Sequence, residues 1–176
     1  MIDFIIHKKP VTKETFVSIG KINDKSLMNL FKKEIDKGVK NNHNNYKTNV
    51  YGEMTSFKFF NNRDSFKLLI KKLKPFINKL TNQTIEVTDS WGNILNKGDF
   101  VHEHDHIPNY ISGIVYLTEG EGTYFSEHDL YVKAEVGKFV LFDSVLKHKV
   151  NKSDINKKRY SLAFNFTTLP GYVGEN

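Results

Sequence analysis

After residue 81 the chain is a succession of short apolar runs separated by Gly, Asp and Asn. Runs of this length, bounded by turn-forming residues, are typical of β-strands. We expect eight strands, at residues 85–95, 100–104, 111–117, 122–126, 130–132, 138–142, 146–150 and 159–168. So many short strands in half a chain predict a β-sandwich or barrel of the jelly-roll type.

The N-terminal half has mixed texture, with strand-like runs at residues 1–6 and 15–19 and two helical patterns. Asp24 can cap a first helix, which turns four apolar residues to one face: Leu27, Leu30, Phe31 and Ile35. The second helix has the three-and-four spacing of a buried stripe: Phe66, Leu69, Ile70, Leu73, Phe76, Ile77 and Leu80. Pro75 lies within it and is expected to kink or split it.

The length of 176 residues suits one domain. We expect a mainly β fold, with residues 1–83 as a mixed helical support and residues 84–170 as the β core. No apolar run is long enough to cross a membrane, and the start lacks the features of a signal peptide, which favours a cytoplasmic protein. Cysteine is absent, which excludes disulfides, thiolate metal sites and a cysteine nucleophile.

The net charge of +6 comes from 24 Lys and two Arg against 20 acidic residues. The simplest interpretation is a solvated lysine-rich surface, because the lysines are spread along the chain and no nucleic-acid motif accompanies them. The scarcity of Arg is more informative. In a chain that uses Lys for most positive charges, an Arg is favoured where its fork-shaped guanidinium is needed.

Three histidines alternate in the stretch Val-His-Glu-His-Asp-His, at positions 102, 104 and 106. On an extended segment, positions two apart point the same way, so either His104 with His106 or His102 with His104 can face one ion. The best candidate for a third ligand is His148. Histidine clusters suit iron, zinc, copper or nickel. The alternative is a polar loop with exposed histidines.

The last predicted strand has two different faces. One face carries Arg159, Ser161, Ala163 and Asn165, and the other carries Tyr160, Leu162, Phe164 and Phe166. The aromatic face should be buried. On the other face, a guanidinium beside a hydroxyl can clamp a carboxylate. The alternative is an arginine that pairs with an acidic neighbour on the sheet.

Residues 91–165 resemble the 2-oxoglutarate/Fe(II)-dependent dioxygenase superfamily, in particular its phage and marine-bacterial branch. The matching stretches are Ser-Trp-Gly-Asn (90–93), Gly98, His-Asp-His (104–106), Ser-Gly-Ile-Val-Tyr-Leu (112–117), Gly-Lys-Phe-Val-Leu-Phe-Asp-Ser (137–144), His148 and Arg-Tyr-Ser-Leu-Ala-Phe-Asn (159–165). The eleven-residue spacing from His148 to Arg159 is also that of the family.

The resemblance implies a double-stranded β-helix that binds Fe(II) and uses 2-oxoglutarate and O₂ to hydroxylate an unidentified substrate, releasing succinate and CO₂. The residues that match the family's site are His104, His106 and His148 for the metal, Arg159 and Ser161 for the distal carboxylate of 2-oxoglutarate, and Asn93 and Tyr116 as weaker pocket candidates.

One departure concerns the metal ligands. The wider superfamily has His-x-Asp where this chain has His-Asp-His, so the carboxylate ligand is missing. Asp105 and Glu103 should both point away from His104 on a strand. A centre of three histidines would carry more positive charge and hold iron less firmly, although His-x-His is associated with this branch.

Two other functions compete with the oxygenase. A cupin-type metal protein would explain Gly98 and the His-x-His pair, but it lacks the expected following glutamate and gives Arg159 no role. A non-catalytic jelly-roll binding module would bind no metal or bind it without turnover. The prime substrate and the oligomeric state stay open. Lysines at 147, 149, 152, 157 and 158, if they surround the pocket, would favour an acidic substrate such as a nucleic acid.

Overall fold

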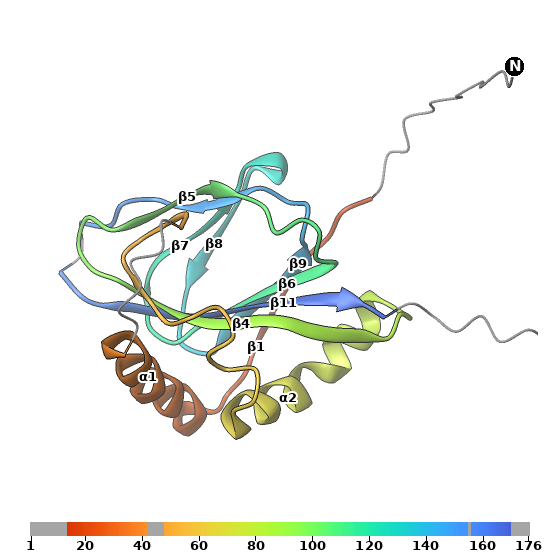
Figure 1. Ribbon diagram of the computed structural model, residues 1–176. Coiled ribbons are helices and arrows are strands. Elements are labelled where there is room, and N and C mark those ends of the chain that lie inside the picture. Colours follow the sequence, from red (N-terminus) through yellow and green to blue (C-terminus); the bar gives the residue numbers. More distant parts are fainter. Residues whose placement is uncertain (1–13, 42–47, 155, 170–176) are drawn as a thin grey trace, which may run out of the picture.

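The structure is a computed structural model that describes residues 14–41, 48–154 and 156–169, so the predicted strand at residues 1–6 lies outside it. The fold is mainly β, with antiparallel pairing throughout the described strands. Two helices, α1 (Lys25–Lys40) and α2 (Asp64–Leu80), accompany the strands. A jelly-roll-like architecture was predicted, and the two opposed sheets agree with it (Figure 1).

The strands form two sheets. The six-stranded sheet has the order β1 (Val17–Lys21), β9 (Lys138–Asp143), β6 (Ile111–Tyr116), β11 (Arg159–Thr168), β4 (Ile85–Leu95) and β3 (Glu53–Met54). The five-stranded sheet has the order β2 (Val50–Tyr51), β5 (Phe100–His104), β10 (His148–Val150), β7 (Gly120–Phe125) and β8 (Leu130–Ala134), with the short 3-10 helix η1 (Ser126–His128) between β7 and β8. The two helices lie against the six-stranded sheet, on the side away from the five-stranded one (Figure 1).

The first helix begins as its sequence suggests, because the Asp24 carboxylate accepts a hydrogen bond from the Leu27 N–H at 3.0 Å. The expected burial of Leu30 is wrong, since its side chain is 44% exposed. The buried stripe instead includes Met28 together with Leu27, Phe31 and Ile35. Leu30 lies off the side of this stripe, which the helical period of 3.6 residues centres on the other four.

The second helix runs without interruption through Pro75, so the expectation of a split helix is wrong. Pro75 and Lys71 are both exposed. Water can therefore bind the Lys71 carbonyl that the missing proline N–H leaves without a helical partner. Neither this helix nor α1 has the length and apolar character that crossing a bilayer requires.

The main core lies between the helices and the six-stranded sheet. Phe31, Leu69 and Leu73 from the helices share it with Leu162 and Phe164 of β11. Close approach is possible because Gly92 has no side chain: a Cβ there would lie 2.2 Å from Cγ1 of Ile35. A smaller cluster, which includes Phe125 and Phe142, fills part of the space between the two sheets.

The eight strands expected after residue 81 are all present, with ends shifted by at most two residues. The strand expected at residues 15–19 is found two residues later. The sequence gives no sign of β2 and β3, because two residues are too few to form a pattern. The division into a support region and a core at residue 83 stays a prediction.

Candidate metal centre

Three histidine side chains converge between the two sheets. His104 ends β5, His106 follows it in the next loop, and His148 begins β10. Strand pairing sets His148 directly opposite His104. One ring nitrogen from each of the three lies within 4.8 Å of the others. This spacing suits three ligands of one metal ion.

A β-bulge decides which histidines face inward. Between the pairs His148↔His104 and Val150↔Val101, β5 contains one residue more than β10. Val101 and His104 therefore both face the interior, whereas His102 is exposed. The pair of His102 with His104, which simple alternation left open, does not form the cluster.

Backbone carbonyls orient two of the imidazoles. Nδ1 of His104 lies 2.7 Å from the carbonyl oxygen of His102, and Nδ1 of His148 lies 3.0 Å from that of Leu146. A carbonyl oxygen can only accept, so Nδ1 carries the proton in both rings. Nε2 is then left with a free lone pair, as a metal ligand requires.

Burial keeps the imidazoles neutral. It lowers the pKa of His148 to about 3 and that of His106 to about 2, with the neighbouring histidines adding to the effect. The pKa of His104 is also lowered, again mainly by burial. Only the neutral form can bind a metal, so the site needs no deprotonation near pH 7 before it takes up an ion.

Hydrogen bonds at the backbone N–H and at the carbonyl of His106 hold the loop that carries this residue. The His106 N–H donates to the Ser144 carbonyl at 2.8 Å, and its own carbonyl accepts from the N–H and the side-chain amide of Asn109, each at 2.9 Å. The ring lies near Trp91, with 5.9 Å between the ring centroids. These contacts fix the one member of the cluster that lies outside a strand.

No carboxylate joins the three histidines in the part of the chain that the structure describes. Asp105 instead accepts a hydrogen bond from the Ile107 N–H at 3.1 Å. Glu103 is exposed. The expectation that both carboxylates stay away from the metal position agrees with this arrangement, and the donor set consists of imidazoles alone.

Arg159 is the second polar feature of the interior, and it is charged. Its side chain is 5% exposed, Nε donates to the Glu121 backbone carbonyl at 2.6 Å, and one terminal nitrogen donates to Oγ of Ser161 at 3.2 Å. Among the described residues, no carboxylate lies within 4.0 Å of it. Burial lowers its pKa, yet a guanidinium stays charged in proteins. An acidic partner on the sheet, the alternative interpretation, is therefore not found there.

One pocket connects the histidine cluster with Arg159. It is lined by all three histidines of the cluster and by Arg159 and Ser161. Two residues of β4, Trp91 and Asn93, also line it. The indole Nε1 of Trp91 and the amide Oδ1 of Asn93 are buried, and neither has a hydrogen-bond partner among the described residues. Buried polar atoms without partners indicate a place for a ligand or for water.

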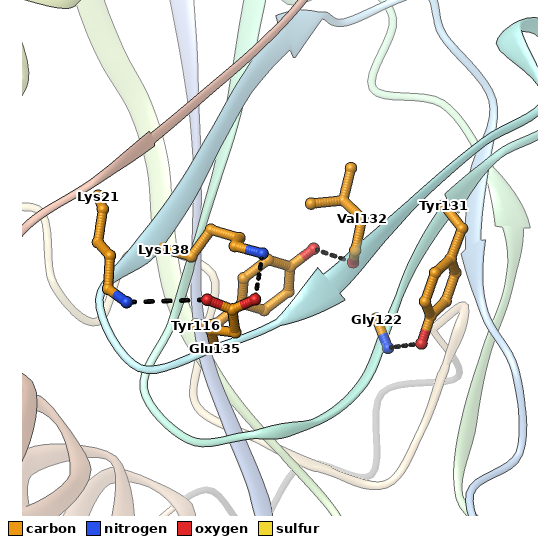
Figure 2. A network of polar contacts seen from close by, with 7 residues as sticks. All are labelled: Lys21, Tyr116, Gly122, Tyr131, Val132, Glu135 and Lys138. Atoms are coloured by element: carbon orange, nitrogen blue, oxygen red, sulfur yellow. Dashed lines mark hydrogen bonds and ion pairs between the residues drawn. The ribbon is translucent and has the colours of Figure 1, made fainter.

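Of the two weaker pocket candidates, only Asn93 lines the pocket; Tyr116 does not. Its hydroxyl donates to Oγ1 of Thr123 at 2.8 Å and also points to the Val132 carbonyl (Figure 2). Its ring lies beside the guanidinium of Arg159, with Cζ 5.3 Å from the ring centroid. The Tyr116 ring therefore packs against the guanidinium of Arg159 without lining the pocket. Thr123, which the sequence did not single out, lines the pocket instead.

These residues fit a metal ion together with a dicarboxylate. Neutral imidazoles that line the pocket supply the metal ligands, and the buried guanidinium, which has no carboxylate within 4.0 Å among the described residues, can take up an anion.

The family comparison agrees with this fit. Residues 121–165 match the family described as "Putative 2OG-Fe(II) oxygenase", and this stretch contains His148, Arg159 and Ser161. The match covers a minority of the chain and supports the predicted resemblance to the 2OG-Fe(II) oxygenase superfamily. Fe(II), 2-oxoglutarate and O₂ are the cofactor, co-substrate and oxidant of that family, and the three histidines could hold its metal. Assignment to the phage branch stays a prediction.

Solved structures share the fold over most of the chain. A viral collagen prolyl hydroxylase from Paramecium Bursaria Chlorella virus-1, in complex with 2-oxoglutarate, is 14% identical, with a TM-score of 0.67 over 86% of this chain and 96% of its own. A Pseudomonas putida prolyl-4-hydroxylase is 16% identical, with a TM-score of 0.66 over 88% and 93%.

HygX from Streptomyces hygroscopicus, with nickel and 2-oxoglutarate bound, is 12% identical, with a TM-score of 0.65 over 88% of this chain and 82% of its own. At such identities the likeness concerns the fold. No curated protein matches the chain.

Proposed function

We propose that this chain is an oxygenase that couples oxidation of 2-oxoglutarate to hydroxylation of a substrate. The observation that carries the proposal is the buried guanidinium of Arg159, which has no carboxylate partner among the described residues and lines the same pocket as the histidine cluster. A structural arginine would be paired with an acid, since an isolated buried charge is costly. A site for a dicarboxylate explains why this cost is tolerated.

When bound, Fe(II) supplies the activation of O₂, in the overall reaction 2-oxoglutarate + O₂ + R–H → succinate + CO₂ + R–OH. His104, His106 and His148 hold the ion through one nitrogen each. Arg159 holds the far carboxylate of 2-oxoglutarate with its fork of donors. The Ser161 hydroxyl accepts from Arg159, so its own proton is free to be donated to the same carboxylate.

Aromatic side chains exclude water from the metal position. The ring of Phe142 lies 4.8 Å and that of Phe125 5.7 Å from the ring of His148, between centroids. The Trp91 ring lies 5.9 Å from that of His106, between centroids. A dry site strengthens the interaction between the metal's charge and a bound carboxylate, and it protects reactive species from side reactions.

The all-imidazole donor set has an electrostatic consequence. Three neutral ligands leave the full 2+ charge on the ion, whereas a carboxylate ligand would reduce it. We therefore expect this centre to hold Fe(II) less tightly than a centre with a carboxylate, and to bind anionic 2-oxoglutarate strongly once the metal is present.

For the prime substrate we propose a peptide or a small molecule. Similar folds are found in prolyl hydroxylases, one of them in complex with a peptide fragment of hypoxia inducible factor, and in HygX, which was also solved with hygromycin B.

Calorimetric titration of the Ni(II)-loaded protein with 2-oxoglutarate tests the proposed role of Arg159. We expect Arg159→Met to weaken binding about 100-fold, because a charge-assisted, bidentate contact is lost in a buried site. The control is Arg63→Met, which removes the other arginine of the chain, bound on the surface to Glu34. Metal binding without any 2-oxoglutarate binding in the unmodified protein would instead favour the cupin or the non-catalytic module.

A further inference from the structure

A second pocket opens next to the metal position, and we call it the mouth. It shares Val50, Trp91, His104 and His106 with the inner pocket, so the two adjoin at the histidine cluster. The remaining residues that line the mouth are Thr48, Asn49, Phe57, Asp105, Ile107 and Asn109. If the proposed function holds, the mouth is where a prime substrate approaches the metal.

The charge of the mouth is opposite to that of the whole protein. Among the residues that the structure describes, neither Lys nor Arg lines it, although the chain contains 24 lysines. The segment that forms much of it continues this bias: residues 98–132 contain no Lys or Arg at all. The acidic residues of that segment are Asp99, Glu103, Asp105, Glu119, Glu121, Glu127 and Asp129.

Asp105 is the carboxylate of the mouth itself. One of its oxygens accepts the Ile107 N–H, and no Lys or Arg among the described residues lies within 4.0 Å of it. It is half-buried and does not belong to the cluster of potential metal ligands. A negative charge thus lies beside the metal position, and no Lys or Arg of the described residues balances it.

Aromatic rings form another part of the lining. Phe57 is 41% exposed and packs edge-on against Trp91, with 5.3 Å between ring centroids. The faces of such rings attract cations, and Trp does so most strongly. Asn49 and Asn109 add polar groups without charge.

The five lysines that favoured an acidic substrate do not line this pocket. Lys149 and Lys152 instead lie over the rings of Tyr124 and Phe100, at 5.4 and 5.1 Å from the ring centroids. Lys157 lines a separate pocket at the Arg159 end of the interior. The structure therefore gives the predicted acidic substrate no support at the mouth.

We infer that the mouth binds a positively charged group of the prime substrate, an ammonium or a guanidinium, against Asp105 and the Phe57–Trp91 pair. The inference rests on the proposed function, because a substrate bound in the mouth can react only if the adjoining site holds a metal. It narrows the substrate from any peptide or small molecule to one that carries a cation near the carbon that reacts.

Three matched probes test this inference: the N-acetyl N-methylamides of lysine, norleucine and glutamate, which are cationic, neutral and anionic. Each is added to the Mn(II)-loaded protein with 2-oxoglutarate under argon, and paramagnetic relaxation of the probe protons reports binding near the metal. We expect the lysine probe to bind about fivefold more tightly than the norleucine probe, as a partly exposed ion pair allows, and the glutamate probe to bind least.

The Asp105→Asn variant keeps the acceptor for the Ile107 N–H and removes the charge. It should abolish the preference for the lysine probe, while Glu103→Gln, an exposed carboxylate outside the mouth, should leave the preference unchanged. Equal binding of the three probes, tighter binding of the glutamate probe, or an unchanged preference in Asp105→Asn would overturn the inference.

Failure of the proposed function is detected separately, by titrating Mn(II) and 2-oxoglutarate in the same samples. If the protein takes up neither, the proposed function fails. Binding of the probes is then followed by the amide chemical shifts of residues 105–107 and 109 in isotope-labelled protein, with the same expected order and the same outcomes against the inference.

Discussion

The two faces of β11 differ in what they contribute to the molecule. The face toward the helices carries Leu162, Phe164 and Phe166, all fully or almost fully buried in an apolar core. The face toward the five-stranded sheet carries Arg159 and Ser161, which are just as buried but polar. One strand thus separates a stabilising surface from a binding surface by the alternation of its side chains.

The comparison shows where the free energy of folding arises. Burial of the apolar face is favourable at about 25 cal/mol for each Å² removed from water. Burial of the polar face costs free energy, because the Arg159 guanidinium has no carboxylate partner in the described part of the chain. The neighbouring polar atoms of Trp91 and Asn93 are also buried without a hydrogen-bond partner among the described residues. We therefore expect substitutions on the apolar face to lower the free energy of unfolding and substitutions on the polar face to affect ligand binding.

The largest loss of stability should come from the apolar face. Phe164 is fully buried, and its ring lies over Gly113, where a Cβ would be 2.2 Å from the ring. Phe164→Ala should lower the free energy of unfolding by about 3–5 kcal/mol, because it leaves a cavity in the core. Urea denaturation measures this change. A loss below about 1 kcal/mol would break the assignment of this face to stability.

A pH series distinguishes the histidine cluster from the apolar core. The pKa values of His148 and His106 are lowered to about 3 and about 2 in the folded state, against an ordinary value of 6.5. The unfolded state therefore binds more protons, and stability that is complete above pH 6.5 is lost as the pH falls toward 3. Each histidine contributes up to about 1.4 kcal/mol per pH unit to this loss.

His148→Gln should reduce the slope between pH 6.5 and 5 by about the contribution of one histidine. The measurement is the free energy of unfolding of the metal-free protein in a chelating buffer at several pH values. Exposed His102→Gln is the matched control and should leave the slope unchanged. An identical slope in His148→Gln and the unmodified protein would contradict the burial of a neutral imidazole.

Removal of the Tyr116 hydroxyl tests whether this side chain only supports Arg159 or also binds the co-substrate. Tyr116→Phe keeps the ring beside Arg159 and loses the hydrogen bond to Thr123. We expect the free energy of unfolding to fall by about 1 kcal/mol, with the 2-oxoglutarate affinity unchanged in calorimetry. A tenfold weaker affinity would instead give the Tyr116 hydroxyl a direct role in binding the co-substrate.

The smallest effect on stability should come from Arg159→Met, although it removes the side chain central to binding. The lost hydrogen bonds to Glu121 and Ser161 are offset by release from burying an uncompensated charge. We expect the free energy of unfolding to change by less than about 1 kcal/mol. A loss comparable to that of Phe164→Ala would show that both faces serve stability.

Much of the β core could be predicted because local patterns determine it. The alternation of β11 correctly separated Arg159 and Ser161 from Leu162 and Phe164, since a strand has a side-chain period of two. Histidines are also rare enough in this chain to draw attention to His104, His106 and His148.

Other features depend on contacts that no local pattern records. The bulge in β5, which turns His102 outward, exists only through its pairing with β10. The position of Trp91 in both pockets depends on the packing of β4 against the metal loop. Pro75 does not split its helix, and this outcome depends on whether solvent reaches the preceding turn.

The central claim is that three histidines and Arg159 assemble one site for Fe(II) and 2-oxoglutarate. The most direct test is an anaerobic titration of the Fe(II)-loaded protein with 2-oxoglutarate, followed by visible absorption. The account predicts a weak metal-to-ligand charge-transfer band that saturates with 2-oxoglutarate and is absent in His148→Ala. Iron binding without such a band, or an undiminished band in His148→Ala, would contradict it.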